Sequence, residues 1–499
     1  MGSDDGSVLS DLHARLLRRD TTLWPVPGEV TAGWLGWLDS LDRAPEHLAR
    51  IVPIVDEVLA DGIDDVVLVG MGGSSLFPLV LAGVWGSASG RPALHVLDST
   101  DPAAVARTEA AVDWGRTLVV AASKSGTTVE TLAHLDRMLE RLGQVHGDRA
   151  GTRVVVVTDP GSALEERART DGFRAVVHGD PDVGGRYSAL SPFGLLPAVL
   201  IGADVDLMLA EARAAARSWA ADPWDSAGPA RLAAHVGEGA LGGRDALHLI
   251  VDPRAGMLGA WVEQLVAESS GKQGRGVLPV VVGGVDEVVA PDRAVVVAVG
   301  DVPGLDALGA IGVPLLAVPW TGPDQVALEA LRWMQAVPLV CALLGVDPFD
   351  QPDVAAAKAA TSEALAHGTE PEDAVPLAAI DGGLADAAYV AVLAYVDPDG
   401  EDARRVRELA GDLAARHRVP VTLGYGPRYL HSTGQLHKGG RADGVLLVVV
   451  GDDPADVPVP GRGHGFSRLK RAQAAGDIVA LRRAGRTVHR VALEGPAAG

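Results

Sequence analysis

The stretch Val66-Val-Leu-Val-Gly-Met-Gly-Gly-Ser-Ser75 decides the fold, because four apolar residues run directly into a turn rich in glycine and serine. It opens an uncharged segment, Val66 to Gly90, that is long enough to span a bilayer. The segment contains six glycines, four serines and Pro78, so we interpret it as a strand, a loop and a helix rather than a membrane span. Short, continuous apolar runs are typical of parallel sheets that helices cover on both faces.

The same pattern recurs along the chain and predicts three α/β units. Strands are predicted at 66–69, 93–97, 117–121 and 153–157, then at 246–251, 277–282, 294–299 and 315–318, and finally at 389–396, 419–424, 444–450 and 487–493. Long helices are predicted at about 324–345 and 353–366. We therefore expect a helical N-terminal extension over 1–50 and α/β units over 51–228, 229–370 and 371–499.

Charge and cysteine content exclude several function classes. The chain has 43 basic and 65 acidic residues, a net charge of −22, which argues against a nucleic acid or an anionic membrane surface as a partner. Its single cysteine excludes a disulfide framework and a multi-cysteine metal cluster, and fits a reducing cytoplasm. Only five of the basic residues are lysines, and we expect them where a compact ammonium is needed: Lys124, Lys272, Lys358, Lys438 and Lys470.

The segment Ala122-Ser-Lys-Ser-Gly-Thr-Thr-Val-Glu-Thr131 follows a predicted strand and opens a helix. Thr127 and Glu130 match a capping box, and an ordinary hydroxyl-rich helix start is the alternative interpretation. That alternative leaves the other hydroxyl-bearing residues and Lys124 unexplained. Hydroxyl and amide donors at the positive end of a helix indicate a phosphate cradle.

Besides an ordinary tight turn, the glycine segment at 70–75 has two interpretations. Glycine there lets a ligand approach the backbone, and the following helix start favours anions. A dinucleotide site, with Asp98 as the acid that binds ribose, would make the protein a nucleotide-dependent oxidoreductase. We rank this alternative low, because Ser75 stands where the third glycine of that motif belongs.

Two further segments suit acid–base chemistry. Asp182-Val-Gly-Gly-Arg-Tyr-Ser-Ala-Leu-Ser191 places Arg186 after two glycines, although a surface arginine is the ordinary alternative. On the helix predicted at 257–268, Gln264 and Glu268 share one face. The dipole at the end of that helix disfavours negative charge on Glu268, which suits a general base.

The last two segments are Asp347-Pro-Phe-Asp-Gln-Pro-Asp-Val-Ala-Ala-Ala-Lys358 and Arg428-Tyr-Leu-His-Ser-Thr-Gly-Gln-Leu-His-Lys-Gly-Gly440. In the first, Gln351 and Lys358 are seven residues apart and project together from a helix. In the second, His431 and His437 have no acidic or cysteine companion, so they are weak metal ligands. We expect no metal and no cofactor.

Together these segments resemble the glucose-6-phosphate isomerase family, over about 65–365 in order and again at 428–440. The resemblance implies two flavodoxin-like sugar-isomerase (SIS) domains of three-layer αβα architecture, followed by a smaller C-terminal α/β unit. The segment at 429–440 is most similar to the isomerase half of bacterial transaldolase–isomerase fusions. Because only about 50 residues precede the first unit, we expect no transaldolase barrel.

The resemblance implies reversible isomerisation of glucose 6-phosphate to fructose 6-phosphate through a cis-enediol, by a cytoplasmic homodimer of glycolysis and gluconeogenesis. The implied catalytic residues are Glu268 as the base, Arg186 at the enediol, and Lys358 with His431 for ring opening. The implied binding residues are Ser123, Lys124, Ser125 and Thr128 for the phosphate, and Gly72, Gly73, Ser74, Gln264 and Gln351 for the sugar.

The order of the segments departs from the family in one respect. In the family, the ring-opening histidine lies between the base and the lysine and comes from the neighbouring subunit. This chain has no histidine between Glu268 and Lys358, and the matching His431 follows both. Two alternatives to the leading hypothesis remain: a dual phosphoglucose/phosphomannose isomerase, and a non-catalytic regulator that binds sugar phosphates.

Overall fold

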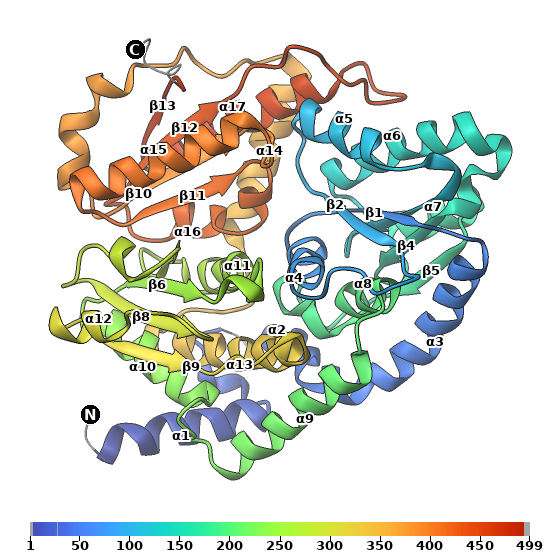
Figure 1. Ribbon diagram of the computed structural model, residues 1–499. Coiled ribbons are helices and arrows are strands. Elements are labelled where there is room, and N and C mark those ends of the chain that lie inside the picture. Colours follow the sequence, from blue (N-terminus) through green and yellow to red (C-terminus); the bar gives the residue numbers. More distant parts are fainter. Residues whose placement is uncertain (1–2, 27, 494–499) are drawn as a thin grey trace.

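The computed structural model describes residues 3–26 and 28–493, and their strands form three parallel sheets (Figure 1). The first sheet has the order β2-β1-β3-β4-β5, the second β7-β6-β8-β9 and the third β11-β10-β12-β13. The strands are β1 Asp65–Gly70, β2 Ala93–Leu97, β3 Thr117–Ala122, β4 Val154–Thr158, β5 Ala175–His178, β6 Ala246–Val251, β7 Leu278–Val282, β8 Ala294–Val299, β9 Leu315–Val318, β10 Val390–Tyr395, β11 Val421–Tyr425, β12 Val445–Val450 and β13 Thr487–Arg490. The α/β prediction is confirmed, and the order of the first sheet is that of flavodoxin-like folds.

Helices surround the three sheets. They are α1 Ser3–Leu17, α2 Gly28–Ala32, α3 Ser40–Ala60, α4 Leu76–Trp85, α5 Pro102–Ala111, α6 Val129–His146, α7 Ala163–Thr170, α8 Pro192–Ile201, α9 Val205–Ala221, α10 Pro229–Leu241, α11 Leu258–Ser270, α12 Asp306–Ala310, α13 Val326–Leu344, α14 Pro352–His367, α15 Glu401–His417, α16 Gly434–Gly439 and α17 Phe466–Arg483. Helix α3 runs through residue 50, where we predicted the end of the N-terminal extension.

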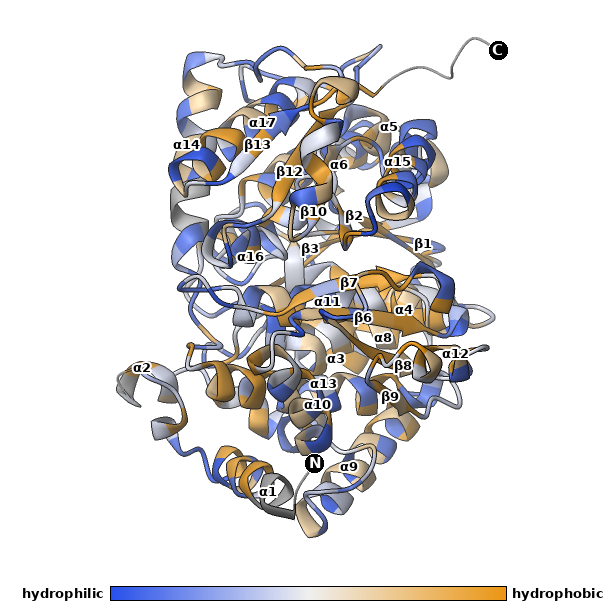
Figure 2. Ribbon diagram, turned by 90° about the vertical axis from the view of Figure 1, so that its left-hand side faces the viewer, coloured by the Kyte–Doolittle hydropathy of each residue, from blue (hydrophilic) through white to orange (hydrophobic). Residues whose placement is uncertain are grey.

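The first sheet is the middle of a three-layer sandwich. Along β1, Val66 and Leu68 belong to the core shared with α3, α4 and α8, whereas Val67 and Val69 pack with α5, α6 and α7. Both faces of the strand are therefore buried, which explains its continuous apolar sequence. Figure 2 shows β1, β6 and β12 as hydrophobic strands inside the molecule, with the more hydrophilic α15 outside.

The apolar segments follow the interpretation drawn from the sequence. The uncharged stretch 66–90 folds as β1, a 3-10 turn at 72–74 and α4. One apolar segment, Pro323–Leu344, is long enough to cross a membrane, and 83% of its most apolar window is buried inside the protein. Such burial is typical of a core helix, and this one, which contains α13, packs on α10, α11 and α9.

The C-terminal unit is fixed to the loop that follows β2 in the first unit. Lys470 of α17 is fully buried, and its ammonium contacts Asp101 at 2.8 Å and Asp453 at 2.5 Å. Gln473, one turn further on, accepts a hydrogen bond of 2.6 Å from Thr100. Figure 1 shows the C-terminal unit beside the first unit and above the second, so it faces both.

The strand order fixes where a ligand can bind. In sheets of this order, the loops after the first and third strands meet outside the carboxyl ends of the strands, at the switch point of the topology. Here those loops are 71–75 after β1 and 123–128 after β3, the two segments that the sequence singled out.

Candidate active site

The segment after β3 gathers hydroxyl groups at the start of α6. The Ser123 and Thr128 side-chain oxygens lie 3.1 Å apart, and the Gly126 amide donates to Ser123 Oγ at 3.2 Å. Gly126 has a φ of +69°, and a Cβ there would lie 2.7 Å from the Leu164 nitrogen, so the turn requires glycine. Hydroxyls and amides at the start of a helix are the donors that an anion site requires.

The Lys124 side chain has partners outside the hydroxyl-rich turn. Its ammonium bonds Asp159 at 2.5 Å and the Asp180 carbonyl at 3.0 Å. Burial raises the pKa of Asp159, although the nearby ammonium opposes that rise. The charge of Lys124 is therefore partly neutralised, and hydroxyls and amides remain as the cradle's donors.

The capping box predicted for α6 is wrong. Thr128 is the residue that caps the helix, and its side chain makes no capping hydrogen bond. The Glu130 carboxylate instead contacts His431 Nε2 at 3.2 Å and accepts 2.7 Å from Gln473 Nε2. The sequence pattern predicted a partner for Glu130 within the same helix start. Both of its partners in the structure lie more than 300 positions further along the chain.

The glycine turn after β1 is shaped by two close approaches. A Cβ on Gly73 would lie 1.8 Å from the Gly185 carbonyl oxygen, so this turn and the turn before Arg186 contact backbone to backbone. A Cβ on Gly72, whose φ is +56°, would lie 2.9 Å from the His431 carbonyl oxygen. Ser74, in the same turn, is buried. Glycine at both positions brings three segments together.

Glu268 lies in the last turn of α11 and is 5% exposed. Its Oε2 accepts a hydrogen bond of 3.2 Å from Gln264 Nε2 and lies 3.7 Å from Arg186 Nε. Arg186, itself 4% exposed, also donates to the backbone oxygens of Glu268 at 2.6 Å and Phe349 at 3.0 Å. A buried carboxylate held beside a fixed cation is the arrangement that proton transfer with charge stabilisation requires.

His431 reaches this site from the C-terminal unit of the same chain. Gln264 Nε2 donates to the His431 carbonyl oxygen at 2.9 Å, and Glu130 contacts the imidazole. Burial opposes ionisation of Glu130, but the charge and hydrogen bond of His431, a backbone hydrogen bond and the charge of His134 together outweigh burial and lower the pKa of Glu130 to about 2. The carboxylate is thus charged near neutrality and orients the ring.

Comparison with known proteins identifies the central part of the chain. Residues 57–277 match the family model described as phosphoglucose isomerase. This part of the chain is similar to phosphoglucose isomerases. A glucose-6-phosphate isomerase of Rubrobacter xylanophilus is 34% identical over 250 residues, which cover 48% of this chain and 57% of that protein. The match thus spans less than two thirds of this relative.

Two solved structures share the fold. A hypothetical protein of Thermus thermophilus has a TM-score of 0.62 and 29% identity, and the alignment covers 73% of this chain and 96% of that one. A glucose-6-phosphate isomerase of Chlamydia trachomatis has a TM-score of 0.57 and 20% identity, with coverage of 68% and 76%. The second likeness supports the fold alone.

Two predicted site residues, Gln351 and Lys358, lie outside residues 57–277 and take no part in the contacts around Glu268. Gln351 precedes α14 and Lys358 lies in its second turn, and both side chains are exposed. In the described part of the chain, neither side chain makes a hydrogen bond or ion pair. Asp350, just before Gln351, accepts a hydrogen bond of 3.1 Å from Arg186 through its carbonyl oxygen, so the start of α14 borders the candidate site.

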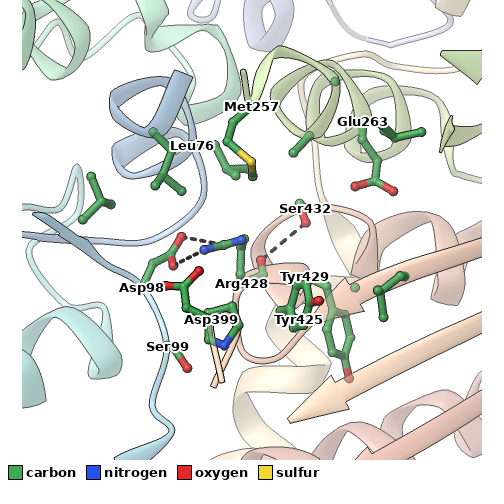
Figure 3. A pocket seen from close by; sticks show the side chains of 18 of the residues that line it. Leu76, Asp98, Ser99, Met257, Glu263, Asp399, Tyr425, Arg428, Tyr429 and Ser432 are labelled. Carbon is green, nitrogen blue, oxygen red and sulfur yellow. Dashed lines mark hydrogen bonds and ion pairs between the residues drawn. The ribbon is translucent and has the colours of Figure 1, made fainter. Parts of the chain in front are cut away.

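Sequence reasoning missed several contacts that join distant segments around the candidate site. Glu130 was assigned to a helix cap, and its only sequence signal was its place inside the cradle motif. Asp98, the acid of the oxidoreductase alternative, instead makes two hydrogen bonds with Arg428, at 2.7 and 2.8 Å (Figure 3). His437 is buried against Tyr389, and burial lowers its pKa to about 3.

Proposed function

We propose that the chain interconverts glucose 6-phosphate and fructose 6-phosphate. The observation that carries the proposal is the buried Glu268 carboxylate, 3.7 Å from Arg186 Nε and hydrogen-bonded to Gln264. Isomerisation of an aldose phosphate requires one base, one cation where enediolate charge develops, and an anion cradle. The relatives' names support the same reaction.

The reaction needs a bound phosphate, an open sugar ring and a proton transfer. In the proposal, Ser123, Ser125, Thr128 and the backbone at Lys124 hold the phosphate, while Gly72, Gly73 and Ser74 line the sugar. His431, oriented by Glu130, opens the ring together with Lys358, and Gln351 lies beside the ring oxygen.

Glu268 then removes the proton from C2 of the open-chain aldose and returns it to C1. The electron pair of the broken C–H bond forms the cis-enediolate, whose charge Arg186 stabilises, and a proton moves between the two oxygens. Gln264 holds the base in place through its hydrogen bond. We further propose that the protein works as a cytoplasmic homodimer, in gluconeogenesis as well as glycolysis, without a nucleic acid or membrane partner, and that it divides into the units stated above.

A coupled assay tests this proposal. Glucose 6-phosphate formed from fructose 6-phosphate would be oxidised by a dehydrogenase, and mannose 6-phosphate would be offered in parallel. We expect turnover of fructose 6-phosphate alone. Turnover of both substrates would indicate the dual isomerase, and turnover of neither, with binding intact, would indicate the regulator.

A further inference from the structure

A cavity lies beside Arg428, Tyr429 and Ser432, which belong to the loop that carries His431 (Figure 3). Its volume is about 630 Å³, enough for a molecule of the size of a sugar phosphate. Its walls come from all three units: Leu76 of α4, Glu263 of α11, and Tyr425 and Arg428 at the end of β11 and beyond. None of the residues to which we assign catalysis or substrate binding lines it.

Glu263 points into this cavity without a partner of its own (Figure 3). Within the described residues, its carboxyl makes no hydrogen bond or ion pair. Burial raises the pKa of Glu263 to about 8, although the charge of Arg428 opposes that rise. Near neutrality the carboxyl therefore keeps its proton, and it can both donate and accept hydrogen bonds.

Two threonines add to the unsatisfied polar groups of the cavity. Thr422 and Thr433 both line it and are 4% and 3% exposed. The hydroxyl of each has no hydrogen-bond partner among the described residues. Buried polar groups in folded proteins are normally paired, so these two hydroxyls, beside the unpartnered and partly buried Glu263 carboxyl, indicate a hydroxylated ligand.

The arginines that line the cavity differ in whether a carboxylate neutralises their charge. Arg428 is neutralised by Asp98, and Arg107 by Asp397 and Asp399, each at 2.7 Å. Arg407, which also lines the cavity, donates to the Tyr425 hydroxyl at 3.0 Å and has no carboxylate partner in the described part of the chain. Its guanidinium is the cation left available for an anionic group.

We propose that this cavity is a second ligand site, for a small polyhydroxylated compound with one anionic group, such as a polyol phosphate. Its hydroxyls bond Glu263 and Thr433, and its anionic group bonds Arg407. Leu76 and Met257 supply an apolar wall for the carbon skeleton. Because Arg428, Ser432 and Thr433 line the cavity and lie in the loop that carries His431, the ligand also regulates ring opening.

Titration calorimetry with glucitol 6-phosphate, which cannot be isomerised, tests the inference on the full chain. We expect two sites per chain. Arg407→Glu should weaken one site by about tenfold or more, because a charge-assisted hydrogen bond is lost, and should leave fructose 6-phosphate turnover unchanged. Arg404→Glu is the matched control on α15, since Arg404 pairs with Glu408 at 2.6 Å and does not line the cavity.

Two further variants keep the test decisive. Ser123→Ala with Thr128→Val should remove binding at the phosphate cradle and spare binding in the cavity. Met257→Trp should fill the cavity and abolish binding there alone. A single site that Arg407→Glu and Met257→Trp both leave intact would overturn the inference. Two sites in a protein that turns over no substrate would overturn the proposed isomerase and leave the second site standing.

Discussion

Helix α11 carries two carboxyl groups with opposite surroundings, the buried Glu268 and the partly buried Glu263. Glu268 meets the Arg186 guanidinium and the Gln264 amide, whereas Glu263 meets neither a hydrogen-bond donor nor an ion-pair partner in the described structure. They are five residues apart, which places them on different faces of the helix. The loop 428–433 contacts both sides, with His431 facing Gln264 and Thr433 lining the cavity of the proposed second ligand site.

The difference shows that the neighbours of a buried carboxyl, rather than its burial alone, decide what it can do. Beside a fixed cation, a carboxylate can accept a proton and return it. Without a partner, burial favours the neutral acid, which suits hydrogen bonding to a ligand. One helix can therefore serve a proton-transfer site on one face and a binding site on the other.

The largest effect should come from Glu268→Gln. The amide keeps the shape but cannot take a proton, so kcat should fall by about 10²–10⁴-fold while glucitol 6-phosphate still binds. Steady-state kinetics and calorimetry measure the two quantities. Glu263→Gln is the matched control on the same helix, and near-normal kcat in Glu268→Gln would remove Glu268 from its role.

A smaller effect should follow from substitutions of His431 and Glu130, the pair on the other side of Gln264. We expect His431→Ala to slow the cyclic substrate by about 10²-fold, and Glu130→Gln by about tenfold, because Glu130 acts only by orienting the imidazole. Adding Glu130→Gln to His431→Ala should cost almost nothing more. Equal slowing of cyclic and open-chain substrates would assign both residues a structural role.

The smallest effect concerns Glu263 and pH. Its folded pKa of about 8 lies above the ordinary 4.5, so the folded state binds more protons than the unfolded state between these values. The free energy of unfolding must therefore fall as pH rises through this range. Glu263→Gln removes that fall, and its Tm should exceed that of the parent by about 2 °C at pH 8 and converge with it near pH 4.

Thermal unfolding followed by circular dichroism at several pH values measures this difference. The Glu268→Gln variant provides the comparison on the same helix. A Tm difference that does not change between pH 4 and pH 8 would mean that Glu263 titrates in the folded protein as it does in the unfolded chain.

The fold was largely predictable from the sequence because its signals are local. Strands buried on both faces must be apolar throughout, so β6 and β8 have the predicted bounds. Strand β5 was missed: it is short, and three of its four residues are only partly buried, which weakens its pattern.

The site was predictable where one segment makes it, and not where distant segments meet. The hydroxyls of 123–128 are adjacent in sequence, so the cradle could be inferred. The pairs Glu130–His431 and Asp98–Arg428 each join residues about 300 positions apart, and no spacing rule connects such partners. Gly72 illustrates the same limit, because the atom that excludes a side chain there belongs to His431. The roles given to the site residues, Gln351 and Lys358 included, stay predictions.

The Lys470 ammonium, enclosed by Asp101 and Asp453, also has a consequence for how chains associate. By holding the C-terminal unit on the first unit, it keeps His431 beside Gln264 within one polypeptide. These contacts need no second molecule, so they persist at any protein concentration. Association between chains is then free to change without altering the geometry around Gln264.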